Sequence, residues 1–165
     1  MILDLKSIFA AEGSAKQIDY EFDMSDTEFS GVFPLKTPVS VSGRVSNSAG
    51  VVSLLLDIRY IYSAPCDRCG EFAERGHNVI LDKMLAVSIE GEDSDTIITV
   101  PNMKLDVDEL VYSEVVLDIP YKHLCNEECK GICSVCGKNL NREKCTCEKK
   151  EIDPRLAKLA ELLDN

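Results

Sequence analysis

The sequence lacks several features that whole classes of protein require. Its 165 residues include no tryptophan and only two histidines. No apolar run approaches the roughly 18 residues that a membrane-spanning helix needs. The first residues, MILDLKSIFAAEG, do not resemble a signal peptide, because Asp4 and Lys6 interrupt any apolar core. We therefore expect a cytoplasmic protein without a membrane partner.

Positive charge is also scarce. The chain has 18 Lys and Arg residues against 29 Asp and Glu residues, which gives a net charge of −11. An acidic balance of this kind opposes loose, non-specific binding to nucleic acids. No nucleophile–base pair and no phosphate-binding glycine loop is evident, and the acidic residues 90–95 are expected to form a solvated loop. The sequence therefore predicts a protein that is not an enzyme and has no small-molecule substrate.

Apolar residues alternate with polar ones along most of the first hundred residues. This period of two is typical of half-buried strands. It predicts strands at 1–9, 17–23, 39–46, 51–63 and 96–100, together with a returning strand in which Val79 to Ile89 are in phase. The long strand 51–63 and the returning strand predict a hairpin whose tip carries Cys66 and Cys69.

Helical spacing replaces the alternation in two places. Residues 106–117 predict a helix that Asp106 caps and that ends before Pro120. Asp153 and Pro154 are expected to begin a second helix. We expect a mainly β (α+β) fold: an antiparallel meander or barrel-like body with two helices and a C-terminal zinc-binding cysteine module. The expected division is 1–124 for the body and 125–165 for the module and the last helix.

Eight cysteines in a protein of the reducing cytoplasm indicate metal binding rather than disulfides. Tetrahedral zinc takes four thiolates at about 2.3 Å, and a Cys-x-x-Cys turn places two of them on one side of the ion. A first set of four is formed by Cys133, Cys136, Cys145 and Cys147. Because such a site is closed, the role of its ion would be structural.

The remaining cysteines form a second set: Cys66, Cys69, Cys125 and Cys129. A second zinc there would hold the module against the β-body. Cys129 and Cys133 could exchange places between the sets, or a single ion could bind, so we expect one or two structural Zn²⁺ ions. His77 and His123 are alternative ligands.

Two other chemistries are disfavoured for these cysteines. The spacing does not match the common ferredoxin run that holds iron–sulfur clusters. A redox-active Cys-x-x-Cys follows a strand and precedes a helix, whereas Cys66 and Cys69 are expected between two strands.

The cysteine module is locally basic. Residues 130–150 contain two acidic side chains, Glu143 and Glu148, against a larger number of basic ones, which are Lys130, Lys138, Arg142, Lys144, Lys149 and Lys150. A four-thiolate zinc site carries a charge of about −2, so part of this positive charge merely neutralises it. From the residues alone, nucleic-acid contact and protein contact are equally supported.

Three stretches together resemble the YceD family. They are Cys66-x-Arg68-Cys69-Gly70 after a long strand, the cysteine motif from Cys129 to Cys147, and Asp153-Pro154-Arg155-Leu156-Ala157-x-Leu159. The resemblance spans roughly residues 50–163. It implies a non-enzymatic ribosome-biogenesis factor that is needed for the synthesis, processing or stability of 23S ribosomal RNA (rRNA). It carries over Cys66, Arg68 and Cys69 for the body, and Cys133, Cys136, Cys145 and Cys147 for the tail motif.

These observations lead to one functional hypothesis and one alternative. We expect a ribosome-assembly factor that contacts large-subunit rRNA or a ribosomal protein bound to it. Candidate phosphate contacts are Arg68, Lys138, Arg142 and Lys144. The alternative is a zinc-stabilised protein-interaction module that holds a basic ribosomal protein through the acidic body.

Overall fold

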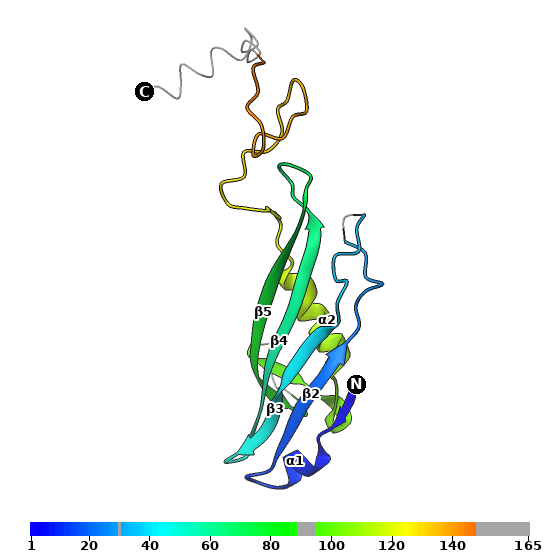
Figure 1. Ribbon diagram of the computed structural model, residues 1–165. Helices are drawn as coiled ribbons and strands as arrows, with labels where there is room; N and C mark the ends of the chain where they lie inside the picture. The colour runs from blue at the N-terminus through cyan, green and yellow to red at the C-terminus, as the bar shows by residue number, and fades with distance from the viewer. Residues whose placement is uncertain (30, 89–94, 148–165) are drawn as a thin grey trace, which may run out of the picture.

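A curled sheet forms the body of the molecule, and the cysteine-rich segment extends from one end of it (Figure 1). The computed structural model describes residues 1–29, 31–88 and 95–147. The chain is mainly β with two α-helices among these residues. Neither helix has the length and apolarity that crossing a membrane requires. The expected fold class is confirmed.

The main sheet has five strands in the order β2-β3-β4-β5-β6. Strands β2 (Ala15–Phe22), β3 (Val39–Ser48), β4 (Val51–Pro65) and β5 (Phe72–Ala86) form an antiparallel meander. The short strand β6 (Ile97–Thr99) runs parallel to the end of β5, with Met84 opposite Ile97. The strands thus form a curled half-barrel rather than a flat sheet.

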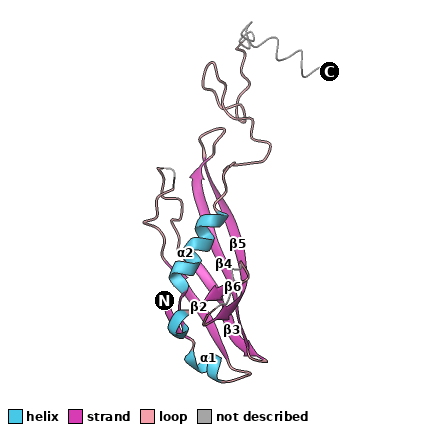
Figure 2. Ribbon diagram, turned by 180° about the vertical axis from the view of Figure 1, so that it is seen from behind, coloured by secondary structure: helices cyan, strands magenta, loops and turns pink. Residues whose placement is uncertain are grey.

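The alternation of apolar residues decides which face of the sheet is buried. In β4 the residues in phase with Leu54, Leu56 and Ile58 are buried, whereas Leu55 and Ile61 on the other face are exposed. Helix α2 (Val107–Asp118) covers the buried face (Figure 2). Its own buried residues join the same core and are Val107, Val111 and Val115.

The ends of α2 lie where the sequence predicts them. The Asp106 carboxylate accepts a hydrogen bond from the backbone N–H of Asp108, and the helix ends at Asp118, two residues before Pro120. At this last residue, Asp118 Oδ2 accepts a hydrogen bond of 2.6 Å from the Tyr60 hydroxyl. The same oxygen lies 3.1 Å from Nδ1 of His77, whose ring stacks on that of Tyr60. These contacts attach the end of α2 to β4 and β5.

The predicted strand at 1–9 is confirmed for Ile2–Asp4 and wrong for the residues that follow. Strand β1 (Ile2–Asp4) is short and pairs with β7 (Lys104–Asp106), and helix α1 (Lys6–Ala10) follows. A 3₁₀ turn, η1 (Pro101–Met103), precedes β7. Leu5 and Ile8 are both buried at a spacing of three, which is helical, whereas the alternation of Leu3, Leu5 and Phe9 with polar residues had indicated a strand.

Three predictions fall partly or wholly beyond the described residues. Ile89, the last residue of the predicted returning strand, lies outside them, as do residues 90–94 of the predicted acidic loop and the whole helix predicted from Asp153. The boundary after residue 124 stays a prediction.

The predicted hairpin is confirmed. Strands β4 and β5 are the longest, with 15 residues each, and their pairing continues to Pro65 opposite Phe72. Residues 66–71 form the tip, which carries Cys66 and Cys69. The chain that follows α2 returns to this end of the molecule (Figure 1), and it brings Cys125 and Cys129 with it.

Candidate metal centres

The first centre lies at the hairpin tip, and we call it the inner centre. It consists of Cys66, Cys69, Cys125 and Cys129, whose sulfur atoms all lie within 4.8 Å of one another. The Cys66 and Cys129 sulfurs are 3.8 Å apart, and those of Cys69 and Cys125 are 3.6 Å apart. Four sulfurs at about 2.3 Å from a zinc ion form a tetrahedron with edges of about 3.8 Å. The spacing of the inner centre therefore fits tetrahedral thiolate coordination.

The local backbone explains how the tip presents two thiols. Gly70 N–H donates to the Cys66 carbonyl at 2.8 Å, and Gly70 has a φ of 73°, which glycine adopts without steric cost. The returning chain is fixed by a reciprocal pair of bonds. Asp67 N–H donates to the His123 carbonyl at 2.9 Å, and His123 N–H donates to Asp67 Oδ2 at 2.7 Å.

The second centre, which we call the outer centre, lies further from the body. It consists of Cys133, Cys136, Cys145 and Cys147, and its sulfurs likewise lie within 4.8 Å of one another. The Cys145 sulfur is 3.4 Å from that of Cys133 and 3.5 Å from that of Cys136. Here Gly137 repeats the turn of Gly70: its N–H donates to the Cys133 carbonyl at 2.9 Å, with a φ of 73°.

The structure thus brings the eight cysteines together in the two predicted sets. Neither His77 nor His123 belongs to either group of candidate ligands among the described residues. Three of the four inner cysteines are buried, whereas the outer ones are exposed or half-buried. That these sets bind metal remains a prediction, but both have the donors and the spacing for it.

Backbone N–H groups favour the thiolate form in each centre. Burial opposes ionisation of Cys66, but N–H groups of Cys125, Arg68 and Cys69 outweigh it and lower the pKa of Cys66 to about 6. In the outer centre, N–H groups of Cys136 and Val135 lower the pKa of Cys133 to about 6. Since the thiolate is the metal-binding form, each centre has at least one cysteine prepared to bind a cation at neutral pH.

The two centres are joined by side chains of the loop between the outer cysteines. Nδ2 of Asn141 donates to the Cys129 sulfur at 3.2 Å, and Oδ1 of Asn141 accepts from Lys130 N–H at 2.8 Å. Glu71 Oε1, at the hairpin tip, accepts from Asn139 Nδ2 at 2.9 Å and from Arg142 Nε at 2.8 Å. The outer loop therefore supplies groups that surround the inner centre.

Arg68 joins the tip to the module through its side chain and its backbone. Its guanidinium donates to the Cys129 carbonyl at 2.8 Å, and its own carbonyl accepts from Ile132 N–H at 3.1 Å. A Cβ at Gly131 would lie 3.0 Å from that carbonyl, and the φ of Gly131 is 73°. Gly131 thus allows the close approach of the two segments.

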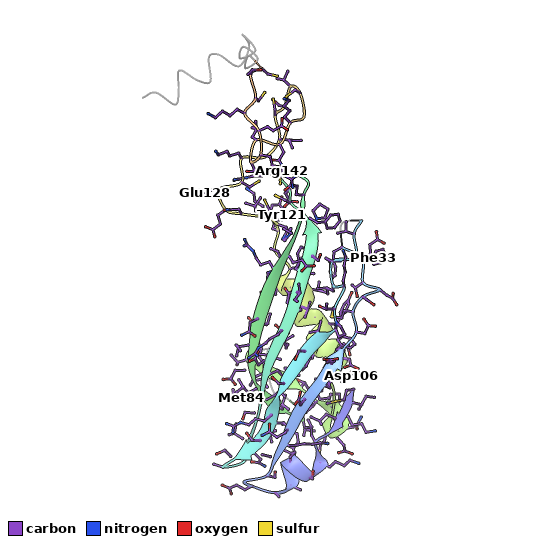
Figure 3. All side chains as sticks on the ribbon, viewed as in Figure 1. Phe33, Met84, Asp106, Tyr121, Glu128 and Arg142 are labelled. Atoms are coloured by element: carbon purple, nitrogen blue, oxygen red, sulfur yellow. The ribbon has the colours of Figure 1, made fainter. Side chains whose placement is uncertain are left out.

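Three of the four predicted phosphate contacts have partners inside the protein. Arg68 bonds to backbone carbonyls, Arg142 pairs with Glu71, and Lys138 Nζ lies 3.3 Å from Glu143 Oε2. Among the described residues, Lys144 makes no ion pair. All four lie at the cysteine-rich end, where Figure 3 labels Arg142. Their contact with RNA stays a prediction.

Sequence reasoning missed the residues that surround the cysteines. It assigned no positioning role to Asn139, Asn141 or Glu71, and it considered His123 only as an alternative ligand. One signal was available: two asparagines within a ligand-bearing loop offer N–H donors that thiolates need. The partner Glu71 gave no such signal, because its proximity depends on how the segments fold together.

Comparisons with known proteins place these features in a family. The model of a family described as "Large ribosomal RNA subunit accumulation protein YceD" matches residues 54–163. The chain is similar to a "Large ribosomal RNA subunit accumulation protein YCED homolog 1, chloroplastic" of Arabidopsis thaliana, with 27% identity over 79% of this chain and 50% of the relative. The protein of the same name in Zea mays is 26% identical over 91% of this chain and 62% of the relative.

Another relative is an uncharacterised protein of Mycobacterium tuberculosis, 29% identical over 59% of this chain and 49% of its own length. The chain therefore spans about half to three-fifths of the curated relatives that it matches. No solved structure matches it.

Proposed function

Because this chain belongs to the YceD family, we propose that it is a non-enzymatic factor needed for the accumulation of 23S rRNA of the large ribosomal subunit. The observation that carries the proposal is the family match over residues 54–163, which includes the hairpin tip and all eight cysteines. The names of the plant relatives point to the same role.

A cellular experiment tests this role. Depletion of the protein is expected to lower 23S relative to 16S rRNA, and a plasmid copy should restore the ratio. A normal ratio after depletion would refute the proposal. A complementing copy with C69S and C129S then asks whether the inner centre is required, since both cysteines are buried candidate ligands.

In this proposal both centres hold structural Zn²⁺. Sulfur spacings of 3.4–3.8 Å, together with closed sets of four cysteines, support a tetrahedral ion. When bound, each ion would crosslink chain segments that have little apolar core of their own. Elemental analysis of anaerobically purified protein should find two zinc ions per chain. A metal-free protein with a readily cycling disulfide would instead support redox chemistry.

We further propose that the cysteine-rich end contacts large-subunit rRNA. Its basic side chains, Arg68, Lys138, Arg142 and Lys144, support this because phosphate contacts come chiefly from Lys and Arg. Lys144 is the sharpest test, since reversing its charge breaks no ion pair among the described residues. K144E should weaken crosslinking to large-subunit fragments. K16E makes the same charge change at an exposed position of strand β2 and should leave crosslinking unchanged.

The charge distribution favours a second candidate, in which the acidic body holds a basic ribosomal protein. The net charge is −11, and internal contacts already engage three of the four candidate cations. A pull-down that survives nuclease treatment would support this candidate over direct RNA contact.

A further inference from the structure

A pocket of 470 Å³ opens beside the inner centre, and no part of the proposed role uses it. It lies between the end of β4, the segment after α2 and the loop that contains Phe29. Asp67, which lies between two cysteines of the inner centre, forms part of its wall. Its volume falls within the range of about 300–1,000 Å³ that is usual for ligand pockets.

Aromatic rings form much of the wall. Tyr62 and His123 both line the pocket, and their rings meet edge to face with centroids 5.0 Å apart. Phe29 and Tyr121 also line it. The Tyr121 side chain is fully exposed and lies near the cysteine-bearing end of the hairpin (Figure 3). The faces of such rings carry negative electrostatic potential and attract cations.

The charge of the pocket has one sign. Asp67 is the single formally charged residue in the lining, which contains no Lys or Arg among the described residues. Its Oδ2 accepts from His123 N–H, and Asp67 has no ion pair within the described part of the chain. Burial raises the pKa of Tyr62 and the Asp67 carboxylate raises it further, so the hydroxyl stays a neutral donor. A phosphate would meet repulsion here, whereas a cation would be attracted.

We propose that this pocket binds an arginine side chain of a basic polypeptide, with the guanidinium against the aromatic wall and hydrogen-bonded to Asp67. A guanidinium is planar, stacks on rings and matches the geometry of a carboxylate. The chain as a whole carries a net charge of −11, which complements a basic partner. The inference rests on the second candidate function, because it states how a basic protein is recognised.

Two labelled peptides test the proposal on the full-length, zinc-loaded chain. One is acetyl-Gly-Arg-Gly-Arg-Gly-amide, and the other has citrulline, the neutral isostere, in place of each arginine. The arginine peptide should bind about tenfold more tightly, since citrulline lacks the charge that both the rings and the carboxylate attract. Amide resonances of pocket residues such as Val116 and Ile119 should shift on binding.

Matched variants separate the pocket from general charge attraction. D67N keeps an oxygen that can accept from His123 N–H and should weaken binding of the arginine peptide about tenfold. D19N removes the same charge from an exposed position of strand β2 and should have little effect on binding of the arginine peptide. Y121A alters a fully exposed ring and should weaken binding about threefold without affecting the fold.

The outcomes that overturn the proposal are specific. Equal affinities for the arginine and citrulline peptides, or equal effects of D67N and D19N, would exclude an arginine pocket. If D67N weakened binding of a single-stranded RNA oligonucleotide and left the arginine peptide unaffected, the pocket would take a nucleobase. Neither result bears on the 23S-to-16S ratio after depletion, so the two proposals fail separately.

Discussion

The side-chain amide of Asn141 donates a hydrogen bond to the sulfur of Cys129 at 3.2 Å. Asn141 belongs to the loop between the outer cysteines, and Cys129 belongs to the inner centre. Asn141 therefore contacts a candidate ligand of the inner centre, although two candidate ligands of the outer centre, Cys136 and Cys145, flank its loop. Loading of the two centres should consequently be coupled.

Replacing Asn141 tests this coupling. N141A removes the bond to the Cys129 sulfur and the acceptor for Lys130 N–H. The metal of the inner centre should therefore bind about 10–100-fold more weakly. Competition with a chelator measures the affinities, and Co²⁺ substitution reports the thiolate environment through its charge-transfer absorption. N78A, which changes an exposed asparagine of β5, is the matched control. Unchanged affinities in N141A would show that the centres are independent.

The strands were predictable because burial on one face imposes a period of two. Val39, Val41 and Val45 are all fully buried in β3, as their alternation with polar residues indicates. The N-terminal segment was not predictable by the same rule, because Leu3 and Leu5 fit a strand while Leu5 and Ile8 fit a helix. Its pairing with β7, about a hundred residues away, decides between them.

The cysteine sets followed from spacing and number, but the groups around them did not. Cys-x-x-Cys pairs are visible as local motifs. The contact of Glu71 with Asn139 and Arg142 depends on how the module folds back against the hairpin tip. Likewise, the positive charges of Arg68, Lys138 and Arg142 were visible in the sequence, whereas their internal partners were not.

Metal removal should unfold the cysteine-rich end and leave the body folded. The main core contains no cysteine, and the buried inner cysteines form a separate cluster. After chelation, hydrogen exchange measured by mass spectrometry should show lost protection in residues 125–147 and retained protection in 52–58. Adding zinc back should restore the first region. Simultaneous loss of protection in β4 would contradict this separation of the two parts.

Two adjacent leucines of β4 should differ sharply in their contribution to stability. Leu56 is 0% exposed and faces the core, whereas Leu55 is 40% exposed on the opposite face. L56A should lower the free energy of unfolding by about 2–5 kcal/mol, because it leaves a cavity in the core. L55A should cost about 1 kcal/mol or less. Urea unfolding of the zinc-loaded protein measures both, and equal costs would contradict the assigned face.

The buried hydroxyl of Tyr60 makes a prediction about alkaline conditions. Tyr60 donates to Asp118 Oδ2 at 2.6 Å. Burial raises the pKa of Tyr60 above its ordinary value of 10.0, and the bond to Asp118 raises it further. Above pH 10 the unfolded chain therefore releases this proton while the folded chain keeps it, so the free energy of unfolding falls as the pH rises. Below pH 10 the contribution is constant.

Y60F removes the titrating group, so its stability should decline less steeply between pH 10 and pH 11 than that of the wild type. Urea unfolding at several pH values measures the two slopes. Y112F removes a hydroxyl from an exposed ring of α2 and should decline as steeply as the wild type. The variant Y60F should also be less stable at pH 8, because Asp118 loses a hydrogen-bond donor. Parallel slopes for Y60F and the wild type would mean that Tyr60 ionises equally in both states, which its buried contact with Asp118 opposes.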